Sequence, residues 1–350
     1  MALNIELLAE TCKTPGTSGF EQKVRELVIR ELTGVVDELS TDNLGNVYAL
    51  KKGQKDKKVM IGAHMDEIGF MVTHIDDKGF IRFTTLGGFD PKTLTAQRVI
   101  IHGKKDIIGV MASKPIHVMT PDERNKVAKL TDYFIDTGLS KEEVMASITI
   151  GDPITREREF IEMGNCVNSK SLDNRLAVFI LIETMKQLQH VDVPYDIYGV
   201  FTVQEEVGIR GANVSALKIN PDFGFGLDTT IAFDLPGAAE YEMITKLGEG
   251  TAIKIMDASA ICDYRMVDYM KKTAEKHAIK WQPEILTAGG TDTAGIQRMS
   301  QGGAIAGAVS IPTRHLHQVI EMANKDDIQG SIDLLKVCLI DLDTYDWEFK

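Results

Sequence analysis

The chain has 350 residues, of which 43% are hydrophobic and 26% are charged, so it is long enough for two domains or for one large core with an insert. This ordinary balance argues against disorder of the whole chain. Its 39 basic and 51 acidic side chains give a formal net charge of −12, which argues against nucleic acid as the main partner because an acidic surface repels phosphate.

The amino-terminal stretch MALNIELLAETCK does not have the pattern of a signal peptide, because Glu6 and Glu10 interrupt it and no basic segment precedes it. No stretch approaches the roughly 18 apolar residues that a membrane-spanning helix needs. The four cysteines lie far apart without CxxC spacing, which favours buried free thiols over disulfides or a thiolate zinc site. We therefore expect a cytoplasmic protein without a membrane partner.

The first elements are predicted in the segment before residue 65. Ser18 and Glu21 in TSGFE fit a capping box, and residues 22–32 that follow have apolar side chains at helical spacing. A helix is therefore predicted there. Residues 46–50 and 59–63 predict strands, separated by the basic turn KKGQKDKK.

From residue 68 to 163 short apolar runs follow one another, with Gly and Asp between them. This pattern predicts a small antiparallel β-rich domain. Within it, residues 121–147 are polar and predict a partly helical insert.

From residue 164 onward, candidate strands alternate with candidate helices. Strands are predicted over residues 196–204, 222–228 and 303–311, and helices over residues 176–188, 263–278 and 326–342. The alternation predicts an α/β fold in which a mixed sheet is sandwiched by helices. Because residues 1–67 resemble residues 164–350 more than they resemble the middle, we expect them to form one domain into which residues 68–163 are inserted.

Polar clusters follow several of the apolar runs, and ligands of α/β sheets gather at the carboxyl ends of strands. His64 and Asp66 come directly after the strand at 59–63 and, two residues apart, would face the same way in an extended chain. A ligating imidazole needs a partner for its other nitrogen, which Asp66 could provide for His64. The alternative is a polar turn that faces solvent.

Three further clusters carry carboxylates. Asp173 precedes the helix at 176–188 and is either a metal ligand or a helix cap. Glu205 and Glu206 follow the strand at 196–204, and neighbouring carboxylates repel each other unless a cation is near, so a solvated turn explains them poorly. Asp228 ends the apolar run FGFGLD and could instead cap a turn.

His315 and His317 follow the strand at 303–311 as an HxH pair, which is common in metal sites but not specific to them. Imidazoles and carboxylates without cysteine suit zinc, cobalt or manganese. Two divalent ions in such a set would lower the pKa of water and polarise a scissile carbonyl, while Glu205 or Glu206 moves the proton.

The motifs together resemble one family over essentially the whole chain. AHMDEIGFMV, SLDNR, QEEVGIRGA, GLDTT, GGTDTAGI and SIPTRHLH occur in this order, and the set resembles the TET-type dinuclear metalloaminopeptidases, which include glutamyl, leucyl and lysyl aminopeptidases. The resemblance implies a metal-dependent hydrolase that removes the N-terminal residue of peptides. It also implies that the insert at 68–163 serves in dimerisation, and that six dimers form a hollow tetrahedral dodecamer that admits only peptides.

The resemblance further implies the roles of single residues, with zinc or cobalt as the metal. Glu205 would be the general base and then the general acid, and Asp66 the partner of His64. The implied ligands fall into two sets that share one bridging carboxylate: His64, Asp173 and Asp228 for one ion, and Asp173, Glu206 and His317 for the other.

Two departures from the family pattern stand out. His315 occupies the place of a usual aromatic residue, and Gln318-Val319 replaces Ser-Pro. His315 is therefore either an extra polar group at the site or a competing ligand. Thr293 stands where a small residue is more usual, which would alter the wall of the substrate pocket.

Other function classes stay open from the sequence. A deacylase or carboxypeptidase would use the same ligands, whereas a glycoside hydrolase would need two carboxylates but neither His64 nor His317. A non-catalytic scaffold would have closed structural metal sites, and Glu205 beside a ligand argues against it. The preferred first residue also stays open, with Arg210, Lys254 and Arg298 as candidate pocket residues.

Overall fold

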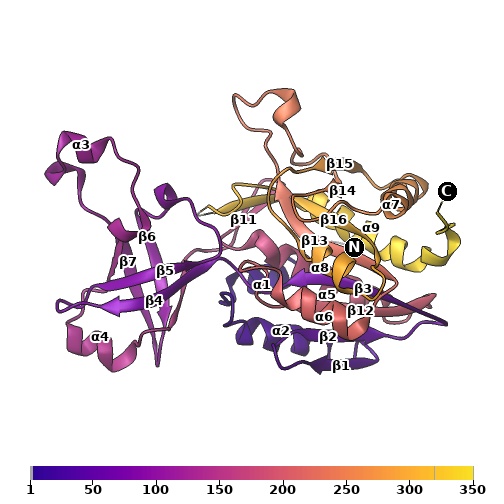
Figure 1. Ribbon diagram of the computed structural model, residues 1–350, viewed down its shortest axis with the longest axis horizontal. Helices are drawn as coiled ribbons and strands as arrows, with labels where there is room; N and C mark the ends of the chain where they lie inside the picture. The colour runs from indigo at the N-terminus through magenta and orange to yellow at the C-terminus, as the bar shows by residue number, and fades with distance from the viewer. Residues whose placement is uncertain (1–2, 319, 350) are drawn as a thin grey trace.

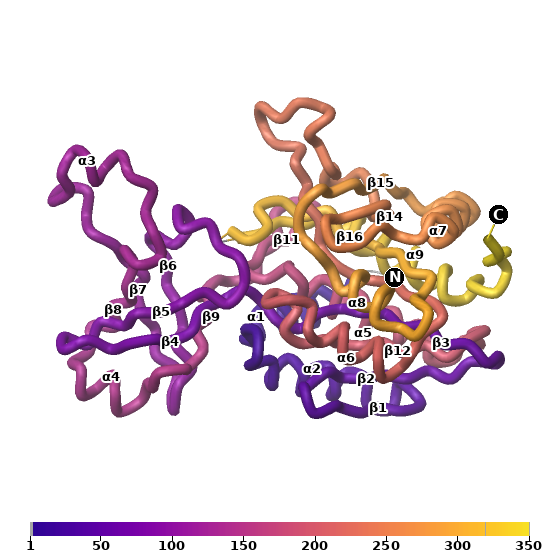
Figure 2. Tube along the Cα trace, in the orientation of Figure 1, coloured from indigo at the N-terminus to yellow at the C-terminus, as the bar shows by residue number. Residues whose placement is uncertain are grey.

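The computed structural model describes residues 3–318 and 320–349 of the chain. In these residues the strands form one eleven-stranded sheet and one closed barrel, which lie side by side in Figure 1. The chain leaves the large sheet after β3 and returns to it after β9, so the barrel occupies one continuous purple-to-magenta stretch of the trace in Figure 2.

The large sheet has a parallel centre and antiparallel edges. β12 and β13 both pair in parallel with β3, and β16 pairs in parallel with β13. The strand order is β1-β2-β12-β3-β13-β16-β17-β11-β10, with β14 paired to β16 and β15 paired to β14. Its strands are β1 (Glu38–Thr41), β2 (Val47–Lys51), β3 (Lys55–His64), β10 (Ile161–Met163), β11 (Cys166–Ser169), β12 (Tyr195–Thr202), β13 (Phe223–Ile231), β14 (Thr251–Met256), β15 (Trp281–Ile285), β16 (Ile305–Arg314) and β17 (Glu321–Asn324).

Helices cover both faces of this sheet, which confirms the predicted α/β sandwich. One face packs against α1 (Ile5–Lys13), α2 (Gln22–Leu32), α5 (Leu172–Leu188), α7 (Tyr264–Lys276) and α9 (Lys325–Ile340). The other face packs against α6 (Arg210–Ile219) and α8 (Asp292–Met299). Short 3-10 helices occur at η1 (Pro91–Thr93), η2 (Ile116–Val118), η3 (Leu130–Asp132), η4 (Glu240–Glu242) and η5 (Leu342–Thr344).

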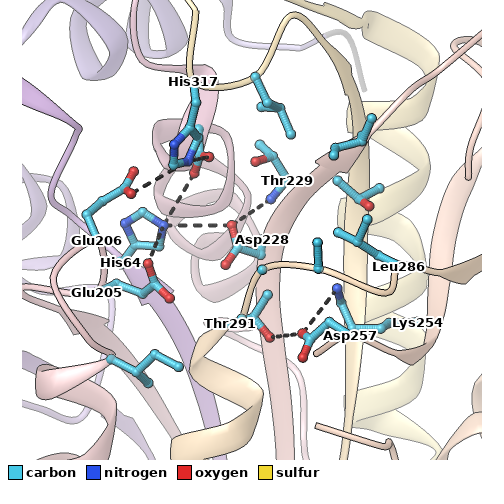
Figure 3. Close-up of a pocket in the computed structure, with 18 of the residues that line it drawn as sticks. His64, Glu205, Glu206, Asp228, Thr229, Lys254, Asp257, Leu286, Thr291 and His317 are labelled. Carbon is cyan, nitrogen blue, oxygen red and sulfur yellow. Dashed lines mark hydrogen bonds and ion pairs between the residues drawn. The ribbon is translucent and has the colours of Figure 1, made fainter. Parts of the chain in front are cut away.

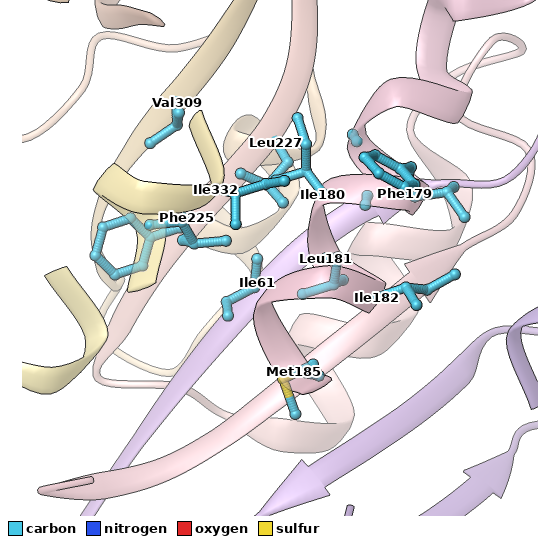
Figure 4. Packing of buried hydrophobic residues seen from close by; sticks show 14 of the residues in the cluster. Ile61, Phe179, Ile180, Leu181, Ile182, Met185, Phe225, Leu227, Val309 and Ile332 are labelled. Carbon is cyan, nitrogen blue, oxygen red and sulfur yellow. The ribbon is translucent and has the colours of Figure 1, made fainter. Parts of the chain in front are cut away.

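The central helix α5 is apolar on nearly all sides because it lies between the sheet and other helices. Its residues 176–182 are all buried, and α1, α2 and α9 pack against it, with α2 and α9 also in contact with strands of the sheet. Figure 4 shows Phe179 to Ile182 of α5 packed with Ile61, Phe225 and Leu227 of the strands and with Ile332 of α9. This packing fixes the position of α5 and therefore places its first residues at one edge of the sheet.

Glycines in the central strands let α8 approach closely. Gly62 of β3 and Gly226 of β13 are register partners in the sheet. A Cβ atom at Gly62 would contact Asp292, and a Cβ atom at Gly226 would collide with Thr293, both at the start of α8. The absence of these two side chains therefore sets the position of the GGTDTAG segment.

The barrel has its own apolar core. Its strand order is β4-β5-β8-β7-β6-β9, and its interior is filled by side chains such as Phe70, Ile101 and Ile135. The strand β7 alternates between buried and exposed residues, as expected for a half-buried strand. The barrel's elements are β4 (Gly69–Ile75), β5 (Ile81–Leu86), β6 (Gln97–His102), β7 (Asp106–Ala112), β8 (Phe134–Asp136) and β9 (Pro153–Arg156), with α3 (Pro121–Arg124) and α4 (Lys141–Ser147) between strands.

We propose that the barrel is the inserted domain expected over residues 68–163. The strand β10, within that range, pairs with β11 of the large sheet, so the proposed boundary moves to the segment between Arg156 and Ile161. Among the described residues, no helix has both the length and the apolar character needed to cross a membrane.

The capping box predicted before α2 is wrong. The N-cap of α2 is Glu21, and no side chain caps this helix. Ser18 instead donates a hydrogen bond to the Asp66 carboxylate at 2.6 Å, and the Glu21 carboxylate accepts from the backbone N–H of Gly19 and of Gln204. Both side chains are therefore drawn away from the helix by residues distant in sequence. The helices α1, α6 and α8 were not predicted from the sequence.

Candidate active site

The parallel strands bring the predicted site residues to one edge of the large sheet. His64 is the last residue of β3, Glu205 and Glu206 follow β12, and Asp228 lies in the carboxyl-terminal half of β13. His317 follows β16, which runs parallel to β13. Because the carboxyl ends of parallel strands meet at the same edge, residues more than 250 positions apart come together here (Figure 3).

The first group of possible metal ligands contains His64, Asp173 and Asp228. Its ligand atoms all lie within 4.8 Å of one another, and all three residues are buried. The Nε2 atom of His64 lies 3.4 Å from Asp173 Oδ1 and 3.7 Å from Asp228 Oδ1. Asp173 stands at the start of α5, next to a cis peptide bond with Asn174.

The second group contains Asp173, Glu206 and His317, so Asp173 is common to both. His317 Nε2 lies 3.3 Å from Asp173 Oδ2 and 3.6 Å from Glu206 Oε2. Asp173 Oδ1 and Glu206 Oε1 are buried and accept no hydrogen bond. Buried carboxylate oxygens without donors, facing imidazole nitrogens, form a nitrogen and oxygen donor set that suits divalent transition metals.

The electrostatics of the site reflect carboxylates crowded away from water. Burial raises the pKa of Glu205 well above its usual range, and the neighbouring Asp228 and Glu206 add to the shift. Burial and the charge of Asp173 together raise the pKa of Glu206 to about 8. Without cations, the site therefore holds protons that isolated carboxyl groups would release near neutral pH.

The two histidines and Asp173 shift in the sense expected of paired charges. Burial disfavours the charged form of His317, but hydrogen bonding to Asp173 outweighs it and raises the pKa of His317 to about 10. Burial likewise opposes ionisation of Asp173, yet His317 and His64 lower its pKa below the usual value. In the metal-free protein, the protonated imidazole rings of the two histidines therefore supply the positive charge next to these carboxylates.

Asp66 organises the site through both its backbone and its side chain. Its carbonyl oxygen lies 3.0 Å from His64 Nδ1, while its carboxylate Oδ1 lies 3.4 Å from that nitrogen. The carboxylate accepts the backbone N–H groups of Glu205 at 3.0 Å and Glu206 at 3.2 Å. Sequence reasoning identified a contact with His64 but missed that Asp66 holds the loop of the paired glutamates.

The barrel reaches the site at two points that sequence reasoning missed. The carbonyl oxygen of Gly88, in the loop after β5, lies 2.9 Å from His317 Nδ1. Arg156, at the end of β9, is buried and donates to the carbonyl oxygens of Lys170 and Gln318. The segments that carry Asp173 and His317 are therefore both tied to the barrel. In the sequence, the only signal for Arg156 is its place among the charged residues of PITREREF, and this pattern does not indicate which residues the arginine contacts.

A second layer of buried charge lies behind Asp173. Glu321 of β17 accepts the backbone N–H of Asp173 at 2.9 Å, and Glu67 contacts Lys170 and Arg175. Burial raises the pKa of Glu321 to about 8. None of these residues was predicted, because each acquires its role only through contacts made in the folded chain.

A cavity of about 450 Å³ opens beside the two ligand groups. Of the GGTD segment, Gly289, Gly290 and Thr291 line it, whereas Thr293 does not. The Thr293 side chain packs on Gly226 and accepts a hydrogen bond from the hydroxyl of Thr291 at 3.0 Å, so it contacts the wall from behind, and its effect on the pocket stays a prediction. The full lining is His64, Asp173, Glu205, Glu206, Gly208, Ile209, Asp228, Thr229, Thr230, Ile231, Lys254, Asp257, Leu286, Ala288, Gly289, Gly290, Thr291, Leu316 and His317.

The remaining candidate residues differ in whether they line the cavity. Lys254 lines the cavity, but Arg210 is bound to Gln204 and Arg298 to a carbonyl of its own helix. His315 belongs to neither ligand group within the described residues and does not line the cavity. Val319, the second departure after His317, lies outside the described residues.

Comparison with known proteins points to one family. A sequence profile described as M42 glutamyl aminopeptidase matches residues 45–334. A protein of Acetivibrio thermocellus named putative aminopeptidase is 40% identical over 331 residues, 94% of this chain and 96% of its own. The crystal structure of a TET aminopeptidase from the marine sediment archaeon Thaumarchaeota archaeon SCGC AB-539-E09 superposes with a TM-score of 0.94 at 34% identity, covering 97% of this chain and 96% of that one.

A further similar structure belongs to a protein that forms large assemblies. The TET1 peptidase of Pyrococcus horikoshii can assemble into a tetrahedron or a large octahedral shell. It superposes with a TM-score of 0.86 at 31% identity, and the match covers 96% of this chain and 99% of that one. The similarity thus extends over both the large sheet and the barrel.

Proposed function

The chain belongs to the M42 glutamyl aminopeptidase family, and we propose that its two ligand groups hold two divalent metal ions that serve the aminopeptidase reaction. Family membership confirms the resemblance drawn from the motifs: the protein is a hydrolase that removes residues from the N-termini of peptides. The observation that carries the metal proposal is the pair of triads sharing Asp173, each with its ligand atoms within 4.8 Å.

In this proposal, one ion is held by His64, Asp173 and Asp228, and the other by Asp173, Glu206 and His317. Zinc or cobalt suits the two sets, because both combine imidazole nitrogens with carboxylate oxygens and neither includes a thiolate. Two such ions supply a Lewis acid that polarises the scissile carbonyl and lowers the pKa of water. Each set counts only three protein ligands, which leaves positions open for chemistry.

Glu205 is the residue that moves the proton. It belongs to neither ligand group, yet its Oε2 atom lies 3.8 Å from His64 Nε2 and it lines the cavity. A carboxylate in this position accepts a proton from the attacking water on Oε2 and then delivers it to the leaving amine. Burial raises the pKa of Glu205 in the metal-free protein, and two nearby cations would lower it again, so that the carboxylate can first accept the proton and later release it.

Asp66 fixes the geometry of this step. By accepting the N–H groups of both Glu205 and Glu206, its carboxylate holds the general base and a metal ligand at a constant separation. Its carbonyl oxygen selects the tautomer of His64 that carries a proton on Nδ1 and leaves Nε2 free to ligate. Asp66 is therefore a positioning residue for three members of the site.

The proposal extends to assembly and location. The barrel exposes Ile108 and Val110 on the outer side of β7, with 59% and 49% of their surface accessible, and such a patch suits a contact with a second copy. We propose a dimer through this surface and a dodecamer built of dimers, with peptides as substrates. All four cysteines are free thiols, which supports a reducing, cytoplasmic location.

The test of the function is an assay of aminoacyl amides with and without N-acetylation, in zinc-loaded, cobalt-loaded and chelated protein. We expect cleavage of free-amine substrates only, lost on chelation and restored by metal. Equal cleavage of the acetylated series, or activity that survives complete metal removal, contradicts the proposal.

The ligand assignment has its own matched pair of variants. His317→Ala should lower bound metal from two ions to one per chain, as measured by elemental analysis of the dialysed protein. His315→Ala, two residues away, should retain both ions. Loss of an ion in His315→Ala with retention in His317→Ala would reverse the assignment.

A further inference from the structure

The loop that carries the paired glutamates is held by side chains from outside it. In residues 203–206, which directly follow β12, four consecutive backbone N–H groups donate to side-chain oxygens. The first donates to Asn46 Oδ1 at 3.0 Å, the second to Glu21 Oε1 at 3.1 Å, and the third and fourth to the carboxylate of Asp66. The position of this loop therefore depends on residues that are distant in sequence.

The loop needs such acceptors because its backbone conformation is unfavourable. Gln204 and Ile209 both have a φ of +56°, in the left-handed region that residues with a side chain seldom adopt. On the far side the loop closes on itself, because the carbonyl oxygen of Glu205 accepts the N–H groups of Gly208 and Ile209, both at 2.9 Å. Since Glu205 directly follows Gln204, a change in the backbone of Gln204 would move the carboxylate that transfers the proton.

Two of the acceptors depend on the segment 17–21. This segment contains Glu21, and its Ser18 hydroxyl donates to Asp66 Oδ2 at 2.6 Å. The exposed fractions are 5% for Ser18, 3% for Glu21 and 0% for Asp66. Burial therefore keeps water from competing for these hydrogen bonds.

The segment 17–21 is itself tied to the residue after Asp66. Thr17 forms a parallel β-bridge with Glu67, and the Glu67 N–H donates to the carbonyl oxygen of Gly16 at 2.9 Å. Within the segment, Glu21 Oε1 also accepts the N–H of Gly19 at 2.7 Å. Backbone bonds thus fix the place from which Glu21 reaches the loop.

The position of Glu21 is unfavourable for stability. Burial raises the pKa of its carboxyl group to about 7, and the neighbouring Asp66 adds to the shift. Helix capping does not account for this position, because Glu21 makes no side-chain capping bond to α2. Its contact with the loop gives this buried carboxyl group a role.

We propose that the segment 17–21 positions the general base Glu205. Glu21 does so through the backbone N–H that precedes this residue, and Ser18 does so by orienting the Asp66 carboxylate. Both are positioning residues, because neither lines the cavity. The inference rests on the proposed function and on the role of Glu205 in it.

The test compares two amides of the same first residue in one metal-loaded protein. One amide releases an alkylamine, as a peptide does, and the other releases nitroaniline. Because the more basic alkylamine must be protonated to leave, its release depends more strongly on a correctly placed proton donor. The ratio of kcat for the alkylamide to kcat for the nitroanilide therefore reports on the placement of Glu205 and is independent of the fraction of folded protein.

Glu21→Met removes the acceptor but keeps a side chain of similar size. It should lower this ratio by about tenfold, because the displaced loop misplaces the base, and elemental analysis should find the same metal content as in the wild type. Glu21→Gln should restore most of the ratio, because its amide oxygen accepts the same bonds. The matched control is Glu26→Met, which alters an exposed glutamate of the same helix and should keep the wild-type ratio.

Ser18→Ala provides a second variant that removes only a hydroxyl group. It should lower the same ratio by less than Glu21→Met does, because Asp66 still accepts the two N–H groups of the loop. If Glu21→Met does not fold, Ser18→Ala decides the question, and a ratio equal to that of Glu26→Met then overturns the inference.

In folded Glu21→Met, a ratio equal to that of the control, or loss of a metal ion, overturns the inference and leaves the aminopeptidase function in place. An unchanged ratio in Glu205→Gln overturns the role of that glutamate and the inference with it. Failure of the wild-type protein to cleave any free-amine amide overturns the proposed function itself.

Discussion

The barrel and the catalytic edge of the large sheet bury different kinds of side chain. The barrel interior is apolar, with Phe70, Ile101 and Ile135 fully buried. The sheet edge buries Asp66, Glu67 and many other ionisable groups at comparable depth. Apolar burial stabilises a fold, whereas buried carboxylates destabilise it unless they are paired or bind cations. The barrel core therefore adds to the stability of the fold, whereas the buried carboxylates of the sheet edge reduce stability and supply the reactive groups.

The two regions meet through Arg156, which starts in the barrel and ends among the carbonyl groups behind Asp173 and His317. The barrel therefore supplies more than an outer surface. It holds the segment of the proposed metal ligand His317 in place through this arginine and through the carbonyl of Gly88. Changes in each region, and at their junction, should have distinct effects on turnover, stability and metal affinity.

The largest effect is expected at the catalytic edge. Glu205→Gln should lower kcat by about 10² to 10⁴-fold, because the amide cannot carry the proton from water to the leaving amine. Stability should be unchanged or higher, since burial of this carboxyl group raises its pKa and its ionised form is unfavourable. Steady-state kinetics and thermal unfolding measure the two quantities.

The matched control lies at the end of the barrel. Glu157→Gln alters a glutamate that pairs with the exposed Arg98, and it should retain full kcat. Full turnover in Glu205→Gln with two metals bound would remove Glu205 from the mechanism.

The reverse effect is expected in the barrel core. Ile135→Ala removes a fully buried side chain of β8 and should lower the free energy of unfolding by about 2–5 kcal/mol. Because Ile135 packs in the barrel core and not among the cavity residues, kcat per folded molecule should equal that of the wild type. Denaturant unfolding with active-site titration tests this, and an unchanged unfolding midpoint would show that the barrel does not limit stability.

The metal-free protein should lose stability as pH rises from about 5 to about 8. The folded-state pKa values of Glu206 and Glu321 are about 8 and that of Asp292 is about 7, all above the unfolded values, chiefly because of burial. In this window the folded state binds more protons than the unfolded state, so stability falls with rising pH. His317, with its pKa raised to about 10, acts in the same direction above pH 6.5, because its stabilising proton is lost as pH increases.

Groups with lowered pKa values do not oppose this trend. Asp66, Glu67 and Asp173 are more acidic in the folded state, so their contribution is present above about pH 4 and is lost only on acidification. Bound divalent ions should flatten the curve, because they hold the carboxylates ionised. The free energy of unfolding of the metal-free protein should fall by about a few kcal/mol over this pH range. Thermal unfolding at a series of pH values measures the change. A stability that increases from pH 5 to 8 without metal would contradict it.

The smallest effect is expected at the junction. Arg156→Met should weaken binding of the ion that His317 would help to hold by about 10 to 100-fold, because the carbonyl group of Gln318, next to His317, loses its donor. Calorimetric titration of the chelated protein should show one site weakened more than the other. Arg98→Met, which alters an arginine that is 65% exposed, should leave both affinities intact. Equal weakening at both sites would mean that Arg156 supports the fold in general.

The pattern of residues along the chain determined the fold class and predicted the candidate site residues. Period-two and period-3.6 spacing predicted the strands and helices of the parallel centre, since these depend on neighbours within a few positions. Because strand ends are also predicted from neighbouring residues, the sequence placed five site residues at the ends of strands: His64, Glu205, Glu206, Asp228 and His317. Chemical type alone then suggested nitrogen and oxygen ligands without thiolates.

Only the tertiary structure decided how these residues meet. The capping box of Ser18 and Glu21 was a local inference, and it failed because Asp66 and Gln204, distant in sequence, offered these side chains other partners. The engagement of Lys254 by Glu284, 30 residues away, was equally invisible. Local spacing specifies which elements form, but a buried charge must find its partner wherever the packed core places one, and that partner is set by the fold as a whole.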